Sequence, residues 1–225
     1  ASKNGDPLAL GDDDCVVLVI NTGDLYGIVG GIVFQDNLIL FGRRKAYIID
    51  DSAANSAYWG YYEAPWEGGT ISWKTLVKTP NDIIAMTEDF DIYSVSAANQ
   101  YGDYQTASML QGTGIKEWMR ENLNDTYITD FHGIYDPILR AVRFFVVSKN
   151  SQTIDTCLIH FIDRPLPESW AIQDASGNSA SGYNASCSSL IYAGAGDYQI
   201  WTGDYEGNFW KLNDDTKADG TSSFE

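Results

Sequence analysis

Short stretches in which apolar and polar residues alternate run along most of the chain, and this pattern predicts β-strands. The stretches at 38–42 and 45–50 are separated only by Arg43 and Arg44, which is the spacing of a tight hairpin. Further strands are expected at 15–21, 30–35, 58–64, 70–77, 82–87, 91–96, 103–110, 126–131, 140–148, 155–163, 169–174, 188–196, 198–204 and 208–213.

One segment has a different period and predicts a helix. Ile115, Trp118, Met119 and Leu123 follow an i, i+3, i+4, i+8 spacing, with charged residues between them. We therefore expect a short surface helix near 115–123.

The strand pairs recur along the chain. Leu38 and Ile83 are 45 positions apart, as are Trp73 and Trp118, and the pair at 38–50 matches the pair at 83–96. Repeats of about this length, built of several short strands, are typical of β-propeller blades. The predicted fold is a single all-β, propeller-like domain over 1–225 with about four blades of short antiparallel strands. An incomplete propeller, as a fragment of a longer chain, stays open.

Composition excludes several functions. The chain has 225 residues, and 31 acidic residues against 14 Lys and Arg give a net charge of −17. Nucleic acids are bound mainly through cations that neutralise phosphates, so specific nucleic-acid recognition is not expected. No apolar run is long enough to cross a bilayer, and no membrane partner is expected.

The three cysteines are widely spaced and stand next to small or apolar residues: Cys15, Cys157 and Cys187. We expect them to be buried free thiols.

Catalytic residues are hard to find in this sequence. The two histidines are His132, expected in a loop, and His160, expected to be an ordinary strand residue. Neither accompanies a nucleophile motif or metal-ligand spacing. Glycoside cleavage needs two facing carboxylates, and the candidates are too many to single out a pair: Asp50, Glu63, Glu88, Asp130, Asp136 and Asp204. We expect no enzyme activity, and no catalytic, cofactor-binding or metal-binding residues.

Two stretches raise the question of a binding site. The stretch "QIWTGDYEGNFWKLND" at 199–214 predicts a hairpin whose tip carries Asp204 and Glu206; we expect a structural turn with both carboxylates solvated. The ligand spacing of a calcium loop is matched neither by Asp204, Glu206 and Asn208, which stand at alternate positions, nor by Asp214, Asp215 and Asp219. Aromatic residues crowd "YWGYYEAPWEGGTISW" at 58–73, where they could stack on sugars, but packing between sheets is the favoured interpretation.

The segment "NTGDLYGIVGGIVFQDNLILFGRRKAYIID" at 21–50 resembles β-propeller-like virion proteins of tailed bacteriophages, the tail-hub, nozzle and stopper proteins of short-tailed phages. The segments "LIYAGAGDYQIWTGDYEGNFWKLND" and "LRAVRFFVVSKNSQTIDTCLIHFID" resemble the same family more loosely. Neither the helix at 115–123 nor "DRPLPESW" belongs to the pattern.

The resemblance implies a structural component of a phage tail or head-to-tail connector, made in the host cytoplasm and located in the virion. Its partners would be copies of itself in a ring around the DNA channel and other phage head-to-tail proteins. An acidic surface would let DNA pass without gripping its phosphates. The alternative is a carbohydrate-binding or glycoside-cleaving β-propeller; "EGGTISW" at 67–73 carries only a fragment of the sialidase turn motif.

Overall fold

The computed structural model describes residues 18–23, 26–53, 58–95, 108–165, 168–174 and 184–212, with the backbone of 218–219 and 222–223. Four antiparallel sheets make up most of this part of the chain. The first sheet holds β1 (Gly30–Phe34), β2 (Asn37–Phe41), β3 (Ala46–Asp50) and β4 (Gly60–Glu63); the second holds β5 (Leu76–Lys78), β6 (Ile83–Met86) and β7 (Ile92–Ser94). The third holds β8 (His132–Asp136), β9 (Ala141–Val146), β10 (Thr156–Phe161) and β11 (Trp170–Asp174); the fourth holds β12 (Cys187–Gly194), β13 (Asp197–Gly203) and β14 (Phe209–Leu212).

Shorter elements complete the description. The α-helix α2 (Ile115–Asn122) is followed by the 3-10 helix η3 (Asp125–Asp130), and a second 3-10 helix, η2 (Trp73–Thr75), precedes β5. A two-stranded pair near the end consists of β15 (Ala218–Asp219) and β16 (Ser222–Ser223). No helix in the described part of the chain is both long and apolar enough to span a membrane.

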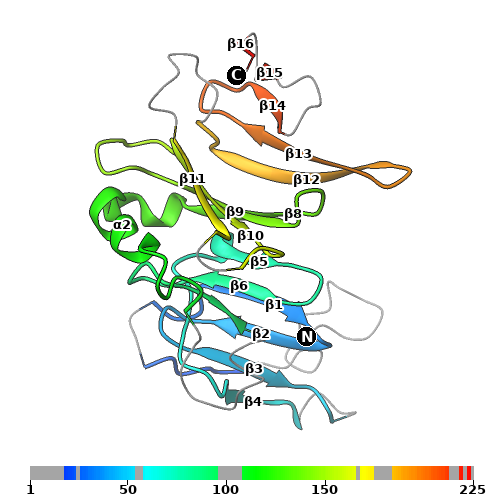
Figure 1. Cartoon of the computed structure of the whole chain (residues 1–225). Helices are drawn as coiled ribbons and strands as arrows, with labels where there is room; N and C mark the ends of the chain where they lie inside the picture. The colour runs from blue at the N-terminus through cyan, green and yellow to red at the C-terminus, as the bar shows by residue number, and fades with distance from the viewer. Residues whose placement is uncertain are drawn as a thin grey trace.

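The four sheets follow one another as the blades of a propeller-like fold (Figure 1). Within each sheet the strands pair in chain order, so the chain enters at one edge and leaves at the other. The first strands contact one another in the order β1, β5, β8, β12, which places them on the inner side of the arrangement. The predicted all-β, propeller-like fold with about four blades is confirmed.

Glycines in the inner strands let neighbouring sheets approach closely. A Cβ atom built on Gly30 of β1 would lie 2.7 Å from the Cβ of Trp73, and one on Gly133 of β8 would lie 2.5 Å from the Cγ2 of Val77. Real Cβ atoms do not approach other carbon atoms so closely, so each sheet contact depends on a residue without a side chain.

Substituting Gly133→Val is therefore expected to destabilise the fold by about 1–3 kcal/mol or more, the usual effect of overpacking a dense core. Urea unfolding followed by tryptophan fluorescence measures the change. The matched control is Gly60→Val in β4, where an added Cβ meets nothing within 4 Å. Equal losses of stability in the two variants would contradict the close-approach argument.

Buried side chains form two clusters, one on each side of the second sheet. The smaller lies between the first and second sheets and includes Phe41 and Tyr93. The larger joins the second sheet, α2 and the third sheet, and includes Met119, Phe144 and Leu158. Every residue of β9 is buried, because neighbouring elements cover both faces of the third sheet.

Most predicted strands are confirmed, and the recurrent pairs occupy equivalent places. The pairs at 38–50, 83–96 and 143–163 are the second and third strands of the first three sheets. The predicted Arg43–Arg44 turn is confirmed by the Gly42 amide, which donates to the Lys45 carbonyl at 2.8 Å. The helix predicted at 115–123 is α2, which buries Met119.

Four strand predictions fail at least in part. Residues 126–131 lie mainly in η3, and only 76–77 of the predicted strand at 70–77 belong to β5, because η2 precedes it. Residues 18–21 are not in a strand, while 15–17 lie outside the described residues. Residues 103–107 are also outside them, and Ser108 forms only an isolated bridge to Tyr93.

Candidate functional site

A cleft of about 590 Å³ opens between the second and third sheets. The β5–β6 turn contributes Thr79, Pro80, Asn81 and Asp82, and the β8–β9 turn contributes Pro137 and Arg140. The strands contribute the remaining walls, with Ile84, Ser94, Tyr135 and His160, while Met109 and Ile162 lie outside named strands. The volume is within the usual range of small-molecule sites.

The charged residues of the cleft already have partners. The Arg140 guanidinium contacts the Asp163 carboxylate at 3.0 Å. Asp82 accepts a hydrogen bond from the Ile83 amide at 2.7 Å and another from the Ser94 hydroxyl. The walls therefore offer hydrogen-bonding groups and apolar surface, together with the Asp82 carboxylate on neutral donors and the Arg140 guanidinium in an exposed ion pair.

His160 lies in β10, as predicted, and its ring packs on Trp170 with centroids 4.7 Å apart. The side chain is only 7% exposed, and its Nδ1 has no hydrogen-bond partner. Burial lowers the pKa of His160 to about 4, so the imidazole is neutral at pH 7.

His132 contradicts its predicted position in a loop. It opens β8, where it is buried and stacks on Phe145 at 4.8 Å. The adjacent Gly133 suggested a turn. In the structure this glycine lies within β8, and its lack of a Cβ atom allows the close contact with Val77. Burial lowers the pKa of His132 to about 4, and the Asp130 backbone offsets only part of that effect.

The candidate carboxylates are dispersed among separate structural contacts. Glu63 pairs with Lys45 at 2.6 Å, and Glu88 with Arg44 at 3.0 Å. Asp50 accepts from the Ser52 amide, while Asp130 is the last residue of η3. None of the six candidate carboxylates lines the cleft. Within the described part of the chain, no three His, Cys, Asp or Glu side chains converge as metal ligands.

Asp136 and Arg143 form a buried ion pair inside the third sheet. The Asp136 Oδ2 accepts from Nε and Nη2 of Arg143, both at 3.3 Å, and its Oδ1 accepts from the amides of Ile138 and Leu139. Asp136 is fully buried and Arg143 nearly so. Asp136 thus holds the β8–β9 turn.

The hairpin predicted at 199–212 is confirmed as β13 and β14, but Asp204 at its tip is not merely solvated. Its Oδ2 accepts from the Trp210 indole at 3.0 Å and the Asn208 amide group at 2.8 Å. Its Oδ1 accepts from the backbone amides of Glu206 and Asn208. The hydrogen bond from Trp210 leads in lowering the pKa of Asp204 to about 2. Asp214, Asp215 and the side chain of Asp219 lie outside the described residues.

Asp204→Ala is therefore expected to lower the Tm and broaden the NMR signals of the 203–210 turn, because four hydrogen bonds lose their acceptor. The contribution of the Asp204 carboxylate to the free energy of unfolding is present above pH 4. It is lost as the pH falls towards 2, because the folded state keeps this carboxylate ionised to lower pH than the unfolded state does. Glu206→Ala, at an exposed position, is the control with little expected effect. Equal Tm values for both variants would support the solvated turn.

The aromatic cluster at 58–73 divides between core and surface, so the favoured packing interpretation is only partly right. Trp66 is buried, whereas Tyr58 is 78% and Trp73 64% exposed. Tyr61 and Tyr62 are also exposed, on opposite faces of the outer strand β4. Within the described part of the chain, β4 is an edge strand of its sheet.

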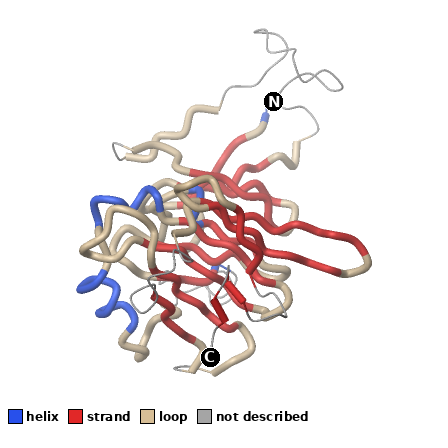
Figure 2. The backbone as a smooth tube through the Cα atoms, turned by 90° about the horizontal axis from the view of Figure 1, so that it is seen from above, coloured by secondary structure: helices blue, strands red, loops and turns tan. Residues whose placement is uncertain are grey.

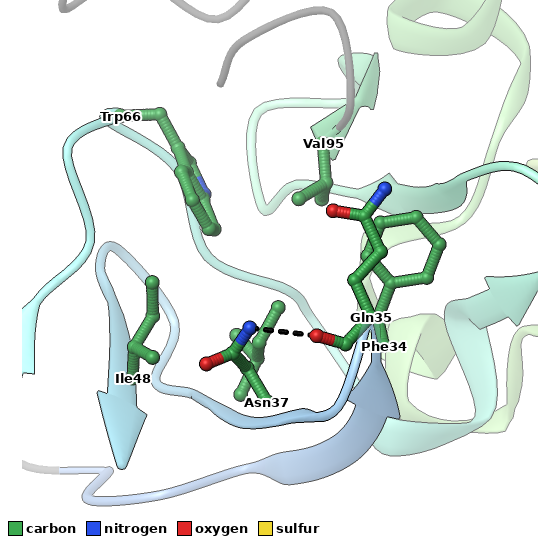
Figure 3. Close-up of a pocket in the computed structure, with 7 residues that line it drawn as sticks. Phe34, Gln35, Asn37, Ile48, Trp66 and Val95 are labelled. Carbon is green, nitrogen blue, oxygen red and sulfur yellow. Dashed lines mark hydrogen bonds between the residues drawn. The ribbon is translucent and has the colours of Figure 1, made fainter. Parts of the chain in front are cut away.

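Trp66 closes a small pocket between the first and second sheets (Figure 3). Its volume is about 40 Å³, and Phe34, Ile48 and Val95 supply apolar walls. The Asn37 side-chain amide donates to the Gln35 carbonyl at 2.9 Å across the turn at its rim. The pocket has room for water but not for an organic ligand.

The fourth sheet leaves many apolar side chains exposed. Leu190, Ile191, Tyr192 and Tyr198 line the far half of the β12–β13 hairpin, and Phe209 of β14 is 73% exposed. The hairpin projects from the rest of the fold (Figures 1 and 2). Cys187 is exposed at its base, contrary to prediction, whereas Cys157 is buried as predicted; Cys15 lies outside the described residues.

Comparison of the chain with protein-family models and with curated proteins gives no match.

Proposed function

We propose that the protein is a non-enzymatic structural component of a phage tail or head-to-tail connector. It acts by assembly, with copies of itself in a ring around the DNA channel and with other head-to-tail proteins of the virion. The resemblance of residues 21–50 to virion propellers supplies the biological setting, and the apolar surface of the fourth sheet carries the argument for assembly.

The arrangement of this surface supports contact with another protein. Tyr192 and Tyr198 face each other across β12 and β13 with ring centroids 5.1 Å apart, and Leu190 lies on the same face two residues away. Ile191 points to the opposite face, so both sides of the hairpin present apolar atoms. Contiguous exposed apolar side chains mark sites of protein association.

Charge supports the same proposal. The segment from Cys187 to Gly203 contains one acidic residue, Asp197, and no basic residue. A hairpin of low charge can approach a second copy although each chain carries −17 overall. The acidic remainder is suited to surround DNA without holding it.

Assembly is tested by light scattering after size-exclusion chromatography and by negative-stain electron microscopy. The unmodified chain is expected to form larger species with increasing concentration, including rings with a central opening. The double variant Tyr192→Ser/Tyr198→Ser should remove them while keeping the monomer folded, because both side chains are exposed. Ile138→Ser, at an exposed turn position in the third sheet, is the matched control.

A strictly monomeric chain at all concentrations, or association that the tyrosine variant leaves intact, would contradict assembly through this hairpin. The phage setting has its own test: mass spectrometry of purified particles of the virus that encodes the chain should detect it in the tail or connector.

A carbohydrate-binding propeller is the second candidate, favoured by the exposed rings of Tyr58, Tyr62 and Trp73. Binding on a glycan array that is lost in Tyr62→Ala and Trp73→Ala would support it. Glycoside hydrolysis that is lost on removal of a carboxylate would support the enzymatic form.

A further inference from the structure

We propose that copies of the chain contact one another head to tail, through two different sheet faces. One is the β12–β14 end face, the face of the fourth sheet that is turned away from the third sheet. The other is the β1–β4 end face, the face of the first sheet that is turned away from the second. This inference rests on the proposed assembly of the chain with itself, and it names the surfaces that meet. The two sheets lie at opposite ends of the fold (Figure 1).

The strand register defines the β1–β4 end face. Ile39 and Ile48 pair across β2 and β3 and belong to the buried cluster between the first and second sheets. Successive side chains of a strand point to opposite faces, so Val33, Leu38 and Tyr61 lie on the end face. Val33 and Leu38 are cross-strand partners that are 54% and 41% exposed, and Tyr61 is exposed as well. This end face therefore presents apolar side chains from three strands.

The β12–β14 end face follows from the register in the same way. Ile200 and Leu212 pair across β13 and β14, and Leu212 packs against the larger buried cluster, so both point towards the third sheet. Ile191, Trp201 and Phe209 lie on the opposite face. Ile191 and Phe209 are exposed, and Trp201 is half-buried. This end face is apolar and aromatic, the composition that marks sites of protein association.

Charge favours a second copy as the partner. The charged residues among the strand positions of the β12–β14 end face are Asp197 and Lys211, one of each sign. On the β1–β4 end face, Glu63 pairs with Lys45, which directly precedes β3, at 2.6 Å. Both end faces are thus balanced in charge, although the chain carries −17. Two copies can meet on these faces without the repulsion that their acidic surfaces would cause elsewhere, whereas a basic partner would be attracted to the acidic remainder.

The contact would continue the packing that holds the fold together. Within the chain, apolar faces of successive sheets cover one another, and the two end faces have the same alternation of apolar and polar positions. Since two different faces meet, every copy in a pair leaves one face of each kind for a further copy. Contacts of this type close into rings or extend as chains, whereas contact of one face with itself stops at a dimer.

The test is sedimentation equilibrium of the full chain and of two double variants over a range of concentrations. Val33→Thr/Leu38→Thr alters the β1–β4 end face, and Ile191→Thr/Phe209→Thr alters the β12–β14 end face. Threonine keeps the strand preference of these positions. Each variant alone should associate with a Kd raised about 10-fold or more, because apolar area is lost from the contact.

Mixing the two variants in equal amounts separates head-to-tail contact from other arrangements. Each variant keeps the face that the other has lost, so the mixture should form a dimer with one copy of each and no larger species. Circular dichroism checks that both variants are folded, and Val33→Thr and Phe209→Thr alone replace a double variant that is not. Ile138→Thr, at an exposed turn of the third sheet, is the matched control and should associate like the unmodified chain.

Association that persists in Val33→Thr/Leu38→Thr, or a mixture of folded variants that stays monomeric, would overturn the inference. Dimers of Val33→Thr/Leu38→Thr alone would overturn it too, because they would show two β12–β14 end faces in contact. These results would leave assembly itself standing. An unmodified chain that is monomeric at every concentration would contradict the proposed function together with this inference.

Discussion

Lowering the pH from 6.5 to about 4 is expected to cost the fold about 3 kcal/mol for each of its two histidines, His132 and His160. Both imidazoles are buried, each against an aromatic ring, and burial lowers the pKa of each from 6.5 to about 4. Protonation inside the fold would place a positive charge on a ring that is largely removed from water.

The direction follows from proton binding in the two states. Above pH 6.5 both states hold neutral histidines, so no free energy is lost. Between 6.5 and about 4 the unfolded chain binds protons that the folded chain does not, so the free energy of unfolding falls with falling pH. Below about 4 the folded state is protonated too, and this loss levels off.

Urea unfolding at a series of pH values between 7 and 5 measures this effect, before most carboxylates titrate. In the variants His132→Phe and His160→Phe the pH slope should be about halved, and in the double variant it should nearly vanish. Phenylalanine keeps a flat ring against Phe145 or Trp170. A slope unchanged in the double variant would assign the acid sensitivity to other groups.

Asp136→Ala is expected to destabilise the protein by about 3–5 kcal/mol, the largest effect of a single substitution predicted for this chain. The substitution leaves the guanidinium of Arg143 buried without its carboxylate at 3.3 Å. It also removes the acceptor of two amides in the β8–β9 turn. Chemical unfolding at pH 7 measures the difference.

The control is Asp163→Ala, which breaks the exposed pair with Arg140. Exposed ion pairs contribute about 0–1 kcal/mol, so this variant should differ little from the unmodified chain. Comparable losses of stability in the two variants would show that burial does not determine how much the Asp136–Arg143 pair contributes to the free energy of unfolding. The variant Asp136→Asn separates the two roles, because its amide oxygen can still accept from the turn.

Local patterns predicted the strands well where apolar side chains alternate with polar ones or fill a buried strand. The stretches around β2, β3, β6, β9, β10 and β13 combine alternation or apolar runs with β-branched and aromatic residues. The recurrence of these pairs also predicted their equivalent places in successive sheets. The helix at 115–123 was predicted for the same reason, since its apolar residues follow the helical period.

Exposure and the candidate cleft could not be predicted in this way. Alternating aromatic residues at 58–62 are the same in sequence whether another sheet covers them or not, and among the described strands β4 lies at the edge of its sheet. Tyr135 and His160 are 25 positions apart and share a row only because β9 pairs with both β8 and β10. No local signal marks a cleft formed by two turns from different sheets.

The sequence by itself determined the all-β class, the strand pairs and the short helix, because these features depend on the spacing of apolar and polar side chains over a few residues. The tertiary structure alone decided that Gly133 is a packing residue of β8, that His132 is buried and that the fourth sheet is exposed. Each of these outcomes depends on which sheet lies against which face. That arrangement follows from contacts between residues far apart in the chain, which no local pattern records.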